Sequence, residues 1–113
     1  MQIIFESRDA SGNQMRDLSV ERVRFALRRL SSFVARARVQ FSDINGPRGG
    51  VDKRCLVELK TDHAGSLVIT SLACDWRVAL DKALALATQV LRRNLQRHQK
   101  IARGRSARLA FDN

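Results

Sequence analysis

The sequence predicts an α+β fold: a two-layer sandwich with the order β-α-β-β-β-α, in which two helices pack on one face of a four-stranded sheet. Two observations favour this fold. Three short stretches alternate apolar and polar residues, as half-buried strands do, and a fourth is apolar on both faces. Two longer stretches repeat apolar residues every three or four positions, as amphipathic helices do. Turn residues separate the last three strands, which must therefore be antiparallel. A chain of 113 residues is long enough for one hydrophobic core.

The N-terminal part is predicted to contain one strand and one helix. Residues 2–7 alternate, with Ile3 and Phe5 on the same side, and residues 11–13 (Ser-Gly-Asn) end this strand. The first helix is expected to begin near Asp17. Its apolar stripe falls at helical spacing and consists of Val23, Leu27, Leu30 and Val34.

Three further strands are predicted in the middle of the chain, at residues 35–44, 52–61 and 67–74. The turns between them are residues 45–50 and 62–65, which are rich in glycine, asparagine and aspartate. Alternation predicts an inner face made of Ala37, Val39, Phe41, Cys55, Val57 and Leu59. The strand at 67–74 is apolar on both faces, so its pattern does not define its register.

The last helix, predicted from Asp75 to about Lys100, is the element around which the rest is organised. Its apolar stripe consists of Leu80, Leu84, Ala87, Leu91 and Leu95. Its outward face carries Arg77, Lys82, Arg92, Arg93, Arg97 and Lys100. No acidic residue occurs from Lys82 to Phe111, so we expect no acidic side chain of this segment to neutralise the basic face. Residues 1–102 are predicted to form the domain, and residues 103–113 a basic C-terminal tail.

The charge of the chain indicates an anionic partner. The formal net charge is +10, with 28% charged and 44% hydrophobic residues. Nucleic acid is the commonest partner of such a protein, and an anionic membrane surface is the main alternative. No apolar run approaches the roughly 20 residues of a membrane span, and the N-terminus does not resemble a signal peptide. We therefore expect a cytoplasmic protein with reduced cysteines.

Basic residues on the two helices and in the long turn are the candidate RNA contacts. Arginine suits phosphate, because its planar fork can donate two hydrogen bonds and can also stack on bases. The candidates on the helices are Arg22, Arg28, Arg29, Lys82, Arg92, Arg93, Arg97, Lys100 and Arg103, and those near the turn are Arg48, Lys53 and Arg54. The alternative is that these charges only solvate exposed faces, which is the interpretation we adopt for Arg36 and Arg38.

Phe25 falls on the polar side of the first helix, between Arg24 and Arg28. An exposed aromatic ring can stack on a splayed RNA base. Packing of the ring on a neighbouring side chain is the interpretation favoured from the sequence.

The cysteines and histidines do not show the spacing of a metal or catalytic site. Cys55 and Cys74 are predicted on neighbouring strands, His63 in a turn and His98 on the last helix, without a close ligand pair. We expect two buried structural cysteines, no metal, no cofactor and no enzymatic activity. The alternative is a small enzyme that uses Cys55, Cys74 or His63 in a pocket.

With these elements in place, the chain resembles the ribosome hibernation-promoting factors and ribosome-associated translation inhibitors. The element order is similar over residues 1–100. The beginning of the last helix is also similar, with Asp75, Ala79, Leu80 and Asp81 followed by the basic residues Arg92, Arg93, Arg97 and Lys100. The segment GPRGGVDKRC at residues 46–55 is similar to a short branch of the family. Trp76 departs from the pattern, because the family aromatic lies one position later.

The resemblance implies a partner and a mechanism. The protein is expected to bind the RNA-lined channel of the small ribosomal subunit, to contact its rRNA, and to block mRNA and tRNA without turnover. It implies a monomer away from the ribosome, with no membrane and no small-molecule substrate as partner. A module that binds a different structured RNA remains the alternative within the binding class.

Overall fold

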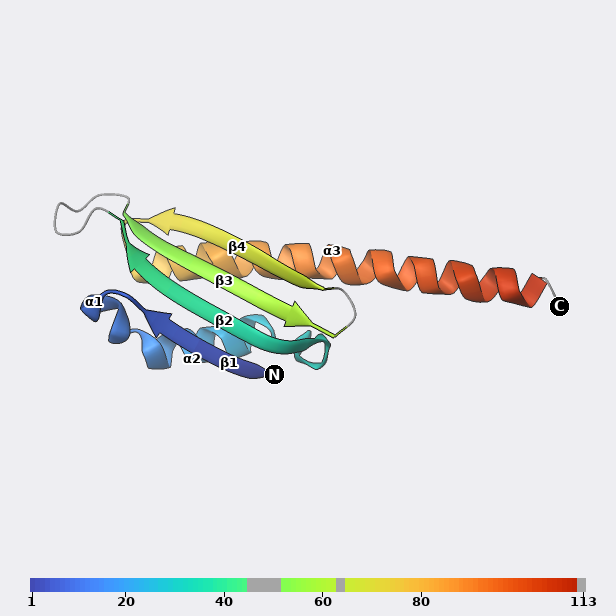
Figure 1. The fold of residues 1–113 in the computed structure, drawn as a ribbon, viewed down its shortest axis with the longest axis horizontal. Coiled ribbons are helices and arrows are strands. Elements are labelled where there is room, and N and C mark those ends of the chain that lie inside the picture. The colour runs from blue at the N-terminus through green and yellow to red at the C-terminus, as the bar shows by residue number, and fades with distance from the viewer. Residues whose placement is uncertain (45–51, 63–64, 112–113) are drawn as a thin grey trace.

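A mixed four-stranded sheet forms one layer of the structure (Figure 1). The computed structural model describes residues 1–44, 52–62 and 65–111, and of residues 98–111 only the backbone. The strands are β1 (Gln2–Ser7), β2 (Val34–Asp43), β3 (Lys53–Thr61) and β4 (Ser66–Ala73), which lie in the sheet in sequence order. β1 is parallel to β2, whereas the pairs β2–β3 and β3–β4 are antiparallel. The predicted α+β sandwich is confirmed.

Both long helices, α2 (Arg16–Ala26) and α3 (Trp76–Phe111), lie on the same face of this sheet (Figure 1). Apolar residues of α2, α3 and the sheet form one continuous core. α2 contributes Val23, and α3 contributes its predicted stripe of Leu80, Leu84, Ala87 and Leu91. The prediction that the helices lie side by side on one face is confirmed. The opposite face of the sheet, here called the open face, is not covered by any helix in the part of the chain that the structure describes (Figure 1).

The alternation in β2 and β3 sets which side chains reach the core. The six predicted inner residues of these strands are all buried: Ala37, Val39, Phe41, Cys55, Val57 and Leu59. Pairing with β3 also sets the register of β4, because Leu59 lies opposite Leu67. Leu67 is therefore buried, whereas Val68 and Leu72 lie on the open face and are about half exposed.

The first helix is shorter than predicted. A four-residue helix, α1 (Ala10–Asn13), precedes α2, and α2 ends at Ala26. Beyond it, the N–H of Leu30 donates to the carbonyl of Leu27, and a short 3₁₀ helix, η1 (Ser31–Phe33), leads into the sheet. Val34 belongs to β2, where it pairs with Thr61. Leu27 and Val34 are core residues as predicted. Their helical spacing was misleading because a turn and a short 3₁₀ helix, and not a continuous α-helix, connect them.

The last helix is longer than predicted. α3 begins at Trp76 and continues to Phe111, through the residues expected to form a tail. At a rise of about 1.5 Å per residue its 36 residues span roughly 54 Å, and the molecule measures 67 Å along its longest axis. Figure 1 shows the C-terminal part of α3 extending past the edge of the sheet. The division of the chain into a domain of residues 1–102 and a basic tail of residues 103–113 stays a prediction.

Candidate nucleic-acid interface

The outer side of α3 carries a group of exposed basic residues. Asp75 caps the helix: its Oδ1 accepts a hydrogen bond from the N–H of Arg77 at 3.0 Å. The buried stripe holds the opposite side against the sheet, so the basic residues lie in solvent. Arg77, Lys82, Arg92, Arg93 and Arg97 are all exposed. Among the described residues, neither Arg92 nor Arg93 nor Arg97 is in an ion pair with a carboxylate.

Arg22 has a different position from the one predicted. Its side chain is not turned outward but lies between the helices, where Nη1 is 3.3 Å from Oδ1 of Asp81 on α3. The side chain of Arg22 is 31% exposed. The sequence could not reveal this pair, because its partner lies on another helix. Arg22 therefore links α2 to α3 and is not a free cation.

Arg28 and Arg29 lie exposed in the turn that follows α2. The Nη1 of Arg28 donates to the carbonyl of Phe25 at 2.7 Å, and its guanidinium lies over the Phe25 ring, 4.1 Å from the centroid. The expectation that Phe25 packs on a neighbouring side chain is confirmed. Phe25 as a whole residue nevertheless remains 67% exposed.

The candidates near the long turn, as far as the structure describes them, do not belong to the exposed basic side of α3. Lys53 points inward, where its Nζ is 2.6 Å from Oδ2 of Asp43 and 3.6 Å from Oδ1 of the buried Asp52. The hydrogen bond to Asp43 raises the pKa of Lys53 above its ordinary value. Lys53 thus compensates buried carboxylates. Arg54 is exposed on the open face, and Arg48 lies outside the described residues.

The open face also carries arginines, and one of them, Arg38, is paired within the sheet. Arg38 donates to Oε2 of Glu6 at 2.8 Å, and this hydrogen bond raises the pKa of Arg38. Arg54 and Arg8 border a small concavity of about 120 Å³ with Gln40 and Ser42. The basic residues proposed from the sequence are therefore divided between two opposite faces. More of the exposed candidates lie on α3 and in the turn after α2 than on the open face.

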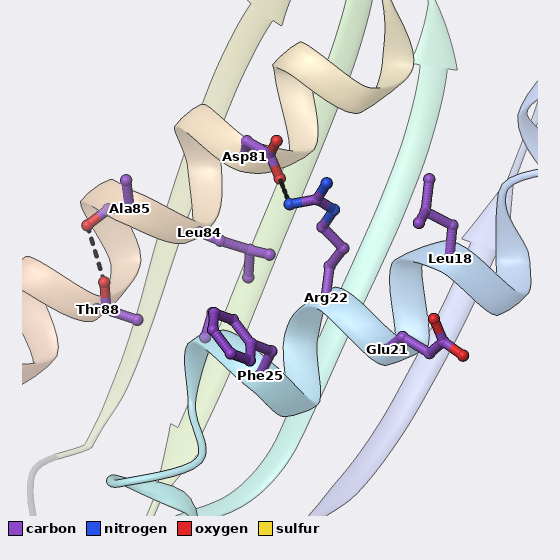
Figure 2. Close-up of a pocket in the computed structure, with 9 residues that line it drawn as sticks. Leu18, Glu21, Arg22, Phe25, Asp81, Leu84, Ala85 and Thr88 are labelled. Carbon is purple, nitrogen blue, oxygen red and sulfur yellow. Dashed lines mark hydrogen bonds and ion pairs between the residues drawn. The ribbon is translucent and has the colours of Figure 1, made fainter.

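A groove runs between α2 and α3 in the middle of the helical face (Figure 2). It has a volume of about 460 Å³ and is lined mainly by Leu18, Glu21, Arg22 and Phe25 from α2 and by Asp81 and Leu84 from α3. We call it the interhelical groove. Of its residues, Arg22 and Phe25 were singled out from the sequence. The groove itself depends on how the two helices pack, and no local pattern indicates it.

The two cysteines lie in different environments. Cys55 is buried, and this burial raises the pKa of its thiol to about 12. Cys74 follows the end of β4 and is exposed, so the prediction of two buried cysteines is wrong for Cys74. Inward positions in β4 are Leu67 and Ala73, and the next residue necessarily faces out. In the part of the chain described here, no three His, Cys, Asp or Glu side chains converge as metal ligands.

The buried thiol makes stability sensitive to alkaline pH. The unfolded chain releases the Cys55 proton near the ordinary pKa of 9.0, whereas the folded chain keeps it to about pH 12. The proton on Cys55 therefore contributes fully to the free energy of unfolding below pH 9.0. As the pH rises from 9.0 toward 12, the free energy of unfolding falls by up to about 1.4 kcal/mol per pH unit. We expect urea titrations on both sides of pH 9.0 to show this loss. Cys55→Ala should weaken the pH dependence; an identical dependence in that variant would contradict the assignment.

Comparison with known proteins supports the fold. No family model and no curated protein sequence matches the chain. Among solved structures, a ribosomal subunit interface protein from Coxiella burnetii is similar, with a TM-score of 0.62 and 14% identity over 82% of this chain and 96% of that one. The N-terminal domain of Thermus thermophilus Protein Y is also similar, with a TM-score of 0.61 and 20% identity over 82% and 98%. The resemblance stated from the sequence is confirmed at the level of the fold.

Within the part of the chain that the structure describes, no helix combines the length and the apolar character needed to cross a bilayer.

Proposed function

We propose that this protein associates with the small ribosomal subunit by binding its RNA, and that it silences translation by occupying the path of mRNA and tRNA. The observation that carries the proposal is the set of exposed arginines on α3 that lack carboxylate partners among the described residues, namely Arg92, Arg93 and Arg97. The fold similarity to a ribosomal subunit interface protein supports the choice of the ribosome.

The mechanism would be electrostatic and steric. Each arginine that neutralises a phosphate releases condensed counterions, which favours binding at low salt. The guanidinium fork can hold phosphate through two hydrogen bonds. A sandwich held against RNA in this way excludes other ligands by its volume and needs no chemical step. The protein would act in the cytoplasm as a monomer.

The buried position of Cys55 favours binding over thiol catalysis. A nucleophilic cysteine needs a depressed pKa and access to substrate, whereas the pKa of Cys55 is raised to about 12. Neither Cys55 nor Cys74 lines the interhelical groove. His63, the third residue of the enzymatic alternative, lies outside the described residues.

Sedimentation with ribosomes tests the proposal. We expect the protein to pellet with small subunits from a crude lysate in low salt and to be released as salt rises. Anionic vesicles serve as the comparison, because a membrane-binding protein would show similar salt sensitivity with vesicles. Recovery with vesicles alone, or with RNA that is not ribosomal, would contradict the ribosomal assignment.

A further inference from the structure

The interhelical groove differs in charge from the basic residues near it. Arg22 and Asp81 form an ion pair inside the groove, and Glu21 lines it from α2 with its carboxylate pointing away from this pair (Figure 2). Arg28 and Arg29 lie in the turn after α2, and Arg92 lies one turn beyond Thr88 on α3. A phosphate is therefore attracted to these three arginines, here called the rim arginines, and gains less in the interior, where Arg22 is already paired with Asp81. A neutral group suits the interior better.

We propose that the interhelical groove receives one unpaired RNA base that bears an exocyclic amino group. This inference rests on the proposed RNA binding and identifies the part of the RNA that the groove takes. The volume of about 460 Å³ falls within the range of pockets that hold small ligands, roughly 300–1,000 Å³. The rim arginines would bind the phosphates on either side of that nucleotide.

Phe25 supplies the stacking surface. Phe25 is 67% exposed although phenylalanine gains from burial, so the fold leaves most of this residue uncovered. In Figure 2 the ring borders the groove on the side of Leu84 and Thr88. The guanidinium of Arg28 lies over the ring, which holds the ring in place and brings a positive charge beside it. Stacking of bases on such a ring tolerates any base.

The ion pair between the helices supplies the preference for an amino group. Asp81 uses Oδ1 to contact Arg22, and its other carboxylate oxygen has no partner among the described residues (Figure 2). A carboxylate accepts a hydrogen bond from the amino group of cytosine, which uracil lacks. The hydroxyl of Thr88 donates to the carbonyl of Ala85 and is not available as a competing donor.

Short oligocytidine and oligouridine of equal length test the inference, since the two bases differ at the amino position. We expect wild-type protein to bind oligocytidine several-fold more tightly. Phe25→Ala should weaken oligocytidine binding by about tenfold, as expected for loss of one stacking contact. Its salt slope should equal that of the wild type, because no charge is removed. Phe25→Trp should keep the affinity, and fluorescence of the new indole should be quenched on binding.

Leu86→Ala is the matched control, because Leu86 is an exposed apolar residue of α3 that does not line the groove. It should bind as the wild type does. Equal affinity for the two oligonucleotides would overturn the inference, and so would wild-type affinity in Phe25→Ala. Either result is expected if the groove binds another protein and not RNA. Wild-type protein that binds no RNA would overturn the proposed function itself.

Discussion

Replacing Arg92, Arg93 and Arg97 together by alanine is expected to weaken ribosome binding strongly and to flatten its salt dependence. If each arginine neutralises one phosphate, the slope of log affinity against log salt should become shallower by about two to three units. The fold should persist, because all three side chains are exposed, no carboxylate pairs with them in the described residues, and alanine is the best helix former. Sedimentation at several salt concentrations measures the slope, and circular dichroism checks the fold.

A variant with the same loss of charge on the open face provides the control. Arg8, Arg36 and Lys60 lie on that face, and Arg36 is opposite Lys60 in the sheet. Their replacement by alanine also removes three positive charges. If the helical face binds, this variant should retain most of the wild-type affinity and slope. Equal losses in both variants would mean that net charge, and not the face of α3, determines binding.

Trp76→Ala is expected to cause the largest loss of stability among single substitutions, about 3–5 kcal/mol of unfolding free energy. Trp76 is buried at the start of α3, and its ring stacks on Phe41 with centroids 4.8 Å apart. Its Nε1–H donates to Oγ of Ser11 at 3.1 Å, and the Lys53 ammonium lies 5.4 Å from the ring centroid. The residue therefore joins α3 to β2 and to α1. Urea titration followed by circular dichroism measures the change.

Two milder variants separate the packing of Trp76 from its hydrogen bond. Ser11→Ala should cost about 1–2 kcal/mol, because it removes the acceptor of the Trp76 N–H and also the exposed hydrogen bond from Ser11 Oγ to Asp9 Oδ1. Trp76→Phe keeps an aromatic ring beside Phe41 but cannot donate, so Ser11→Ala should cost less in this background than in the wild type, by the contribution of the Trp76 hydrogen bond. A Trp76→Ala variant that lost no more stability than Ser11→Ala would contradict the packing role.

The sequence by itself determined the layers of this protein and its basic character. Burial in a strand repeats every two residues, so Val39 and Val57 could be assigned to the inner face from their neighbours alone. Burial in a helix repeats every three to four residues, so the stripe of Leu80 to Leu91 defined at once the buried and the basic sides of α3. These features can be predicted because each depends only on the spacing of residues within one segment.

The tertiary structure alone decided the features that depend on a partner distant in the sequence. Val34 is in a strand because Thr61 pairs with it, although its spacing from Leu27 is helical. Arg22 and Lys53 have the same formal charge as the exposed arginines, yet each lies beside a carboxylate of another element, Asp81 and Asp43. The interhelical groove likewise exists only because α2 and α3 share one sheet face. Such contacts follow from packing across the chain, and the periodicity of a single segment contains no information about its neighbour in space.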